Sequence, residues 1–241
     1  MPTFFITGID TDIGKTLATG LIARYLYRQN KKVITQKPVQ TGQHGDISED
    51  ILEHRRLMGI APLPEDLPGS LPMGTLTCPY SFAYPASPHL AADLEGRRID
   101  PENISRATEV LQKQFEFVLL EGAGGFLVPL TPQFLMADYV ERHQYPVILV
   151  TSGRLGSINH TLLTVEAVQR RNLKIACMVF NQHASQDDTI SGNSLDYFRR
   201  ICPDVIVLPR VAAGQIPEID FACLLGGELI ILTQKIRMGR G

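Results

Sequence analysis

Short apolar runs alternate along the chain with longer segments in which apolar residues recur every three or four positions. The apolar runs are rich in Val, Ile, Leu and Phe and show little polar alternation, which is typical of parallel strands buried on both faces. Strands are predicted at 3–7, 32–37, 116–121, 146–151, 174–180 and 204–208. Helices are predicted at 15–29, 47–58, 101–114, 135–143, 157–171 and 187–201. The pattern predicts a doubly wound, mostly parallel α/β sheet flanked by helices, with ligands at the carboxyl ends of the strands.

The interval 60–90 departs from this alternation because prolines crowd it. They stand at Pro62, Pro64, Pro68, Pro72, Pro79, Pro85 and Pro88. Proline fixes φ and lacks a backbone donor, so we expect neither helix nor strand here. A long ordered loop inside a compact domain is usually functional, and a solvated excursion is the alternative interpretation.

Composition narrows the class of protein. The 241 residues suffice for one large domain, 1–241, and the net charge of -2 with no long basic run argues against nucleic acid as a partner. No apolar stretch is long enough to span a membrane, and the start lacks the basic segment of a signal peptide. Four scattered cysteines without a CxxC pair indicate reduced thiols, neither a zinc site nor a disulfide set, and a cytoplasmic location.

The segment 8–16, GIDTDIGKT, joins the first predicted strand to the first predicted helix. Such a loop turns several backbone N–H groups toward one point and places the positive end of a helix behind them. Lys15 adds a mobile cation, and the Thr16 hydroxyl can hold Mg²⁺. We therefore expect a polyphosphate ligand, ATP, although five residues rather than the usual four separate Gly8 from Gly14.

Charged residues follow the next two predicted strands. Lys37 ends one strand, where its ammonium can approach a γ-phosphate, although alone it would be a surface lysine. Glu121 ends a buried apolar strand, where an acid is costly unless it is paired or binds metal. A third acid comes from the helix near residue 50, and the spacing leaves Asp46, Glu49 and Asp50 as alternatives.

Two later strand ends carry weaker signals. The small-residue loop 152–160 leads into a helix, so it is either an anion site or an ordinary connection. Asn181 and Gln182 follow another strand, and an amide suits the edge of a purine, although Asn is also a common turn residue.

Six segments together resemble the dethiobiotin synthetase family. They are GIDTDIGKT (8–16), KPVQTG (37–42), PYSFAYPASPH (79–89), EGAGG (121–125), LGSINH (155–160) and the strand-end Asn181. The five-residue spacing of the phosphate loop is this family's own form. The resemblance implies a homodimeric ligase that uses Mg²⁺ and ATP to close a ureido ring on 7,8-diaminononanoate with CO₂ or bicarbonate. It implies a carbamate, then a carbamic-phosphoric anhydride, then dethiobiotin, ADP and phosphate.

The resemblance also implies roles for individual residues. Lys37 would be catalytic with Lys15 assisting, and Thr16, Asp50 and Glu121 would hold Mg²⁺. The substrate would meet Thr41, and its carboxylate would meet Gly156, Ser157 and Asn159 across the dimer interface. The implied ATP contacts are Asp12, Ile13, Gly14, Lys15, Thr16, Leu17, Asp50, Glu121, Gly122, Ala123, Gly124, Asn181, Gln182, Pro209, Arg210 and Val211.

The alternative function is a P-loop ATPase switch of the partitioning or division-site type. Phosphate loops of those switches usually carry an extra lysine near the start, and the stretch 8–10, GID, has none. Some of them end in a membrane-binding amphipathic helix. The tail 228–237 has a clustered apolar run that is more typical of a final strand.

Overall fold

The computed structural model describes residues 2–69, 74–184, 187–202, 205–212 and 214–225. A six-stranded sheet with the order β10-β9-β8-β1-β5-β2 forms the centre, and all its pairings are parallel. Its strands are β1 (Thr3–Gly8), β2 (Val33–Gln36), β5 (Phe117–Gly125), β8 (Val147–Ser152), β9 (Ile175–Asn181) and β10 (Val205–Leu208). The doubly wound parallel fold and its six strands are confirmed, with β5 running past its predicted end at 121.

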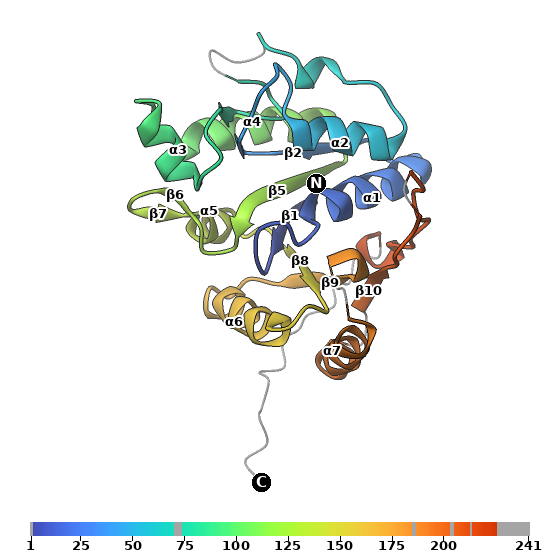
Figure 1. The fold of residues 1–241 in the computed structure, drawn as a ribbon. Helices are drawn as coiled ribbons and strands as arrows, with labels where there is room; N and C mark the ends of the chain where they lie inside the picture. Colours follow the sequence, from blue (N-terminus) through green and yellow to red (C-terminus); the bar gives the residue numbers. More distant parts are fainter. Residues whose placement is uncertain (1, 70–73, 185–186, 203–204, 213, 226–241) are drawn as a thin grey trace.

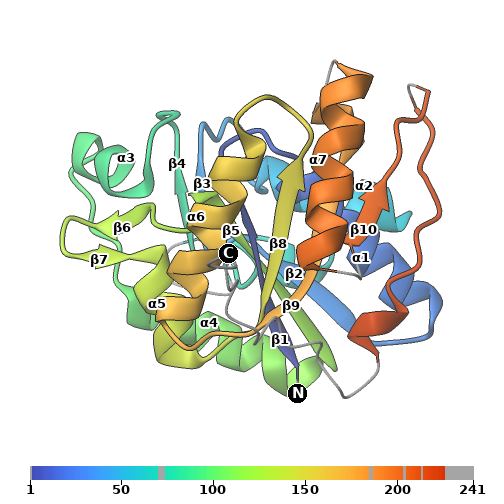
Figure 2. The same ribbon diagram turned by 90° about the horizontal axis from the view of Figure 1, so that it is seen from below.

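Helices cover both faces of this sheet, as Figures 1 and 2 show, with α4, α5 and α6 on one side and α1 and α7 on the other. The six helices predicted from the sequence are α1 (Lys15–Arg28), α2 (Glu49–Met58), α4 (Pro101–Gln114), α5 (Met136–His143), α6 (Ser157–Arg170) and α7 (Asp188–Ile201). Side-chain caps set several of the starts: the carboxylate of Asp100 accepts from Glu102 N, and that of Asp187 accepts from Thr189 N. Local sequence therefore defines these boundaries.

The proline-rich interval 60–90 contains regular structure, so the expectation of neither helix nor strand was wrong there. It holds η1 (Pro64–Asp66), β4 (Tyr80–Phe82) and the start of α3 (Pro88–Leu94), and β4 pairs in parallel with β3 (Val39–Thr41). Two of the prolines occupy positions where the missing backbone N–H breaks no hydrogen bond of a helix or strand. Pro88 occupies the first turn of α3, where the missing N–H has no intrahelical partner, and Pro79 directly precedes β4.

Smaller elements complete the described chain: β6 (Pro129–Thr131) and β7 (Phe134–Leu135) form an antiparallel pair, and η2 (Gln182–Ala184) and η3 (Ala222–Leu224) are short 3₁₀ turns. The tail 228–237 lies outside the described residues. Over the described ranges, no helix combines the length and apolar character needed to cross a bilayer.

Candidate active site at the carboxyl edge of the sheet

A cavity of about 440 Å³ opens at the carboxyl ends of the central strands, a volume ordinary for a small-molecule site. Strand order explains its position. Because β5 lies between β1 and β2, Glu121 falls between the phosphate loop that follows β1 and Lys37, which follows β2. The cavity is lined by Thr11, Asp12, Gly14, Lys15, Thr16, Lys37, Val39, Gln40, Thr41, Asp50, Glu121, Ala123 and Gly124.

The conformation of the phosphate loop requires glycine at position 14. Gly14 has φ of 97°, and a Cβ there would lie 2.2 Å from Nδ2 of Asn181. That same Nδ2 donates to the Ile13 carbonyl at 2.9 Å, and the Asn181 side-chain oxygen accepts from His183 N at 3.0 Å. The end of β9 therefore braces the loop. The sequence pattern left Asn181 as either a purine contact or a turn residue, and the family resemblance implied a contact with the base; neither revealed this contact with the phosphate loop.

Two acids converge on one lysine ammonium in the cavity. Lys37 Nζ lies 2.6 Å from Asp50 Oδ2 and 2.8 Å from Glu121 Oε1. The Thr16 hydroxyl donates to the same Glu121 oxygen at 2.9 Å. The three residues expected to hold a metal ion are thus brought together. Among the acids that spacing left open, Asp50 faces the cavity, whereas Asp46 and Glu49 are exposed.

Burial and charge act against each other in this cluster. Burial alone would raise the pKa of Glu121, but the Lys37 ammonium and His54 hold it well below its usual range. Burial alone would lower the pKa of Lys37, but Glu121 and Asp50 raise it above its usual value. Burial and then the Lys37 ammonium lower the pKa of Lys15 to about 8. Lys37 and Glu121 therefore form a charged pair at neutral pH.

His54 belongs to the site, although the sequence pattern did not single it out. Its Nε2 lies 2.7 Å from Glu121 Oε2, and the side chain is fully buried. A signal was present in the sequence. His54 follows Asp50 by four residues within α2, and side chains four apart on a helix share a face.

Residues of the interval 60–90 hydrogen-bond to the end of β2 and to Lys37, which follows it. Lys37 N donates to the Thr77 carbonyl at 2.7 Å, and the Gln36 side chain donates to the Leu76 carbonyl at 2.9 Å. Arg55 of α2 binds Asp66 through two hydrogen bonds, at 2.8 and 2.7 Å, and both side chains are buried. Asp66 and the stretch 75–80 are therefore buried and support the site, whereas 61–62, 67–69 and 83–85 are exposed to solvent.

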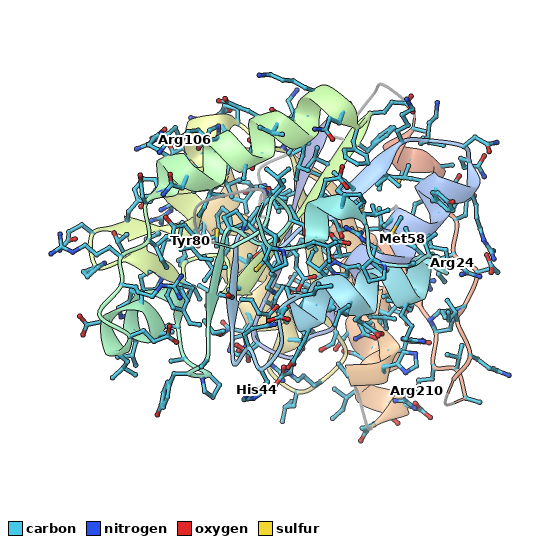
Figure 3. The ribbon with its side chains drawn as sticks, turned by 90° about the horizontal axis from the view of Figure 1, so that it is seen from above. Arg24, His44, Met58, Tyr80, Arg106 and Arg210 are labelled. Carbon is cyan, nitrogen blue, oxygen red and sulfur yellow. The ribbon has the colours of Figure 1, made fainter. Side chains whose placement is uncertain are left out.

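Other expected contacts lie outside the cavity lining. At the start of α6, Gly156 has φ of 91° and the Ser157 hydroxyl lies 3.0 Å from that of Ser152. An ion pair between Arg154 and Asp10 ties this loop to the phosphate loop. The side chain of Arg210, labelled in Figure 3, donates to the Gln182 carbonyl at 3.0 Å and so joins two of the segments expected around the base.

The donor set fits Mg²⁺ better than a metal with an all-protein cage. Within the described ranges, no group of three or more His, Cys, Asp or Glu side chains is arranged to hold a metal ion. Mg²⁺ binds through one or two carboxylates together with water and substrate phosphates. Asp50, Glu121 and the Thr16 hydroxyl, set beside a phosphate loop, offer that combination of hard oxygen donors.

Comparison with known proteins agrees with this geometry. A family model described as an AAA domain matches residues 2–220. The ATP-dependent dethiobiotin synthetase of Chlorobaculum tepidum is 49% identical over 215 residues, covering 89% of this chain and 84% of that protein. A second enzyme of that name, from Pasteurella multocida, is 49% identical over 197 residues and covers 82% and 89%. The one from Anoxybacillus flavithermus is 34% identical over 223 residues and covers 90% and 92%.

Solved structures share the fold at low identity. A MinC:MinD complex from Aquifex aeolicus has a TM-score of 0.52 at 14% identity and covers 88% of this chain and 82% of that one. The receptor FtsY from Elizabethkingia anophelis, in complex with GDP, has a TM-score of 0.51 at 12% identity. The match covers 91% of this chain and 60% of the FtsY chain. These likenesses show a P-loop fold alone. The level and extent of identity to the named synthetases show that the chain belongs to the ATP-dependent dethiobiotin synthetase family.

Proposed function

We propose that this chain closes the ureido ring of dethiobiotin in biotin biosynthesis. Its substrates are 7,8-diaminononanoate, CO₂ derived from bicarbonate, and ATP, and its products are dethiobiotin, ADP and phosphate. The observation that carries the proposal is the cluster in which Lys37, Asp50 and Glu121 meet beside the phosphate loop. Transfer of a phosphoryl group to a carbamate needs cations and hard oxygen donors around the developing charge, and this cluster supplies both.

The proposed chemistry has three steps. One amine of the substrate adds CO₂ to form a carbamate and loses a proton. A carbamate oxygen then attacks the γ-phosphorus of ATP, and ADP leaves. The second amine attacks the carbamate carbon, the C–O bond to phosphate breaks, and the ring closes with release of phosphate and a proton.

This chain's own residues bind and orient the reactants. The N–H groups of residues 12–17 and the Lys15 ammonium hold the phosphates at the start of α1. Lys37, which stays protonated, stabilises the negative charge of the carbamate and of the phosphoryl group in transfer. Thr16, Asp50 and Glu121 would hold Mg²⁺, which when bound neutralises part of the phosphate charge.

The remaining contacts belong to the same proposal. Thr41 lines the cavity near Lys37 and contacts the diamine. The start of α6, with Gly156, Ser157 and Asn159, holds the substrate carboxylate across a homodimer interface. The base contacts are Asn181, Gln182 and the stretch 209–211. The whole chain, 1–241, acts as one domain in the cytoplasm, where cysteines stay reduced.

The deciding experiment measures phosphate release with ATP, Mg²⁺ and bicarbonate, with and without the diamine. We expect release to depend strictly on the diamine and to match dethiobiotin formation measured by mass spectrometry. Hydrolysis that proceeds without diamine and rises with lipid vesicles would instead indicate an ATPase switch. Light scattering during size-exclusion chromatography tests the homodimer, and a monomer at assay concentration would refute the shared carboxylate site.

A further inference from the structure

The two oxygens of the Glu121 carboxylate have separate partners. Oε1 accepts from the Thr16 hydroxyl at 2.9 Å and from Lys37 Nζ at 2.8 Å, on the cavity side. Oε2 contacts His54 Nε2 at 2.7 Å. Because Glu121 and His54 are both fully buried, water does not compete for this second contact.

The direction of the hydrogen bond follows from the surroundings of the imidazole. The Glu121 carboxylate is paired with the Lys37 ammonium at 2.8 Å, and a carboxylate in an ion pair accepts, so Nε2 of His54 carries the hydrogen. Nδ1 of His54 is buried and has no hydrogen-bond partner among the described residues. The described residues therefore offer the ring no second hydrogen bond that competes with its contact to Glu121. His54 then acts as a directional donor.

Helix α2 delivers this donor together with one of the acids. Asp50 and His54 stand four residues apart and so share the helix face that meets the cavity and Glu121. The bidentate contact of Arg55 with Asp66 restrains the same turn of α2. The spacing between Asp50 and His54, which donates to Glu121, is therefore fixed by the geometry of the helix.

We propose that His54 is a positioning residue for the Mg²⁺ site: its Nε2–H fixes the rotamer of Glu121 and leaves Oε1 directed at the metal. This role rests on the proposed function, in which Glu121 is a metal ligand. Outer hydrogen-bond partners of metal ligands typically change metal affinity or activity by about 10- to 100-fold when they are removed. A histidine that merely fills space would have no such effect.

Two substitutions distinguish a positioning hydrogen bond from a side chain that only fills space. His54→Leu keeps most of the volume but removes the donor, and His54→Gln can place an amide N–H near the original Nε2. We expect His54→Leu to weaken Mn²⁺ binding, measured by electron paramagnetic resonance with a non-hydrolysable ATP analogue, by about 10-fold. We expect His54→Gln to recover most of that affinity. The Mg²⁺ concentration for half-maximal ring closure should rise in parallel, with a smaller change in kcat at saturating Mg²⁺.

His143→Leu is the matched control, because this histidine also hydrogen-bonds through Nε2, to the Ser105 hydroxyl at 3.0 Å, but lies outside the cavity. It should leave Mn²⁺ affinity unchanged, and thermal unfolding of each variant checks the fold. Wild-type Mn²⁺ affinity in His54→Leu would overturn the proposal, as would equal losses in the Leu and Gln variants. Failure of the wild-type protein to make dethiobiotin would refute the proposed function separately, because Mn²⁺ binding is measured without turnover.

Discussion

Two lysines face the same cavity but meet different surroundings. Lys37 sits between Asp50 and Glu121, which raise its pKa above the usual value, so its charge is permanent over the physiological range. Lys15 is buried beside that ammonium, and its pKa falls to about 8. Its Nζ donates to the Asp10 carbonyl at 3.0 Å. Glu121, Asp50 and Asp12 offset only part of the lowering of its pKa. A polyphosphate brings further negative charge to Lys15, so nucleotide binding and protonation of Lys15 are coupled.

This coupling predicts the pH dependence of nucleotide affinity. Below pH 8 Lys15 is already protonated in the free protein, and binding needs no proton. Above pH 8 the free protein has lost the proton and must regain it on binding, so Kd for the ATP analogue should rise by about tenfold per pH unit. Calorimetry in buffers of different ionisation enthalpy measures both Kd and the proton uptake. Lys15→Arg, which stays charged, should flatten the profile, and a flat wild-type profile contradicts the coupling.

Removal of the Lys37 charge should affect catalysis far more than nucleotide binding. We expect Lys37→Ala to lower kcat for ring closure by about 100- to 1000-fold, because its ammonium is needed most in the transition state. The Kd for the ATP analogue should change much less, since the phosphate loop and Lys15 remain. Steady-state kinetics and calorimetry give the two values. Lys113→Ala, on the exposed face of α4, should behave as wild type, and wild-type turnover in Lys37→Ala would refute the role of Lys37.

At the scale of elements, the position of α2 decides the site, because α2 carries both Asp50 and His54. It packs closely against α1, and Gly20 of α1 makes the close approach possible. A Cβ on Gly20 would lie 2.4 Å from Leu57 Cδ1 and 3.0 Å from Leu57 Cβ. Nearby, the side chain of Arg24, labelled in Figure 3, donates to the Leu57 carbonyl at 2.9 Å.

Two glycine-to-alanine changes test this contact. In a helix interior, alanine is normally more stabilising than glycine by about 0.5–1 kcal/mol. Gly192→Ala in α7 should follow that rule, because nothing lies within 4 Å of its added Cβ. Gly20→Ala should instead lower the free energy of unfolding by about 1–3 kcal/mol, because Leu57 must move. Urea denaturation measures both, and stabilisation by Gly20→Ala would show that the helices separate at little cost.

Across the whole molecule, the interval 60–90 is held to the sheet by a buried network. Besides its contact with Asp66, Arg55 Nη1 donates to the Thr35 hydroxyl at 2.9 Å. The Thr77 hydroxyl donates to Asp66 Oδ1 at 2.8 Å. The network joins β2, α2 and η1. It therefore restrains the strand that precedes Lys37 and the helix that carries Asp50.

Neighbouring arginines allow a matched test of that network. Arg55→Ala leaves the Asp66 carboxylate buried without its charged partner, and should lower the free energy of unfolding by about 3–5 kcal/mol. Arg56 pairs with Glu53 on the surface, where solvent screens the ion pair, so Arg56→Ala should change stability little. Chemical denaturation compares the two variants. Equal losses of stability in the two variants would mean that the buried Arg55–Asp66 pair contributes no more than the exposed Arg56–Glu53 pair.

Local sequence patterns were enough to predict the sheet strands, the main helices and the phosphate loop. Each depends on a short pattern: an apolar run, a helical period with a cap such as Asp100, or the run Gly14, Lys15, Thr16 between strand and helix. Lys37 and Glu121 could be predicted because parallel strands end at one edge of a sheet. These features depend on neighbours along the chain, so local chemistry was enough to define them.

Three contacts became visible only in the folded chain: the pairing of Asp50 with Lys37, the contact of His54 with Glu121, and the pairing of β3 with β4. The period of a helix shows which positions share a face but not what that face meets. Glu121 and His54 are 67 positions apart, and their contact exists because the order of β1, β5 and β2 and the packing of α2 bring them together. Pairings of this kind depend on strand order and helix packing, which local sequence patterns do not encode.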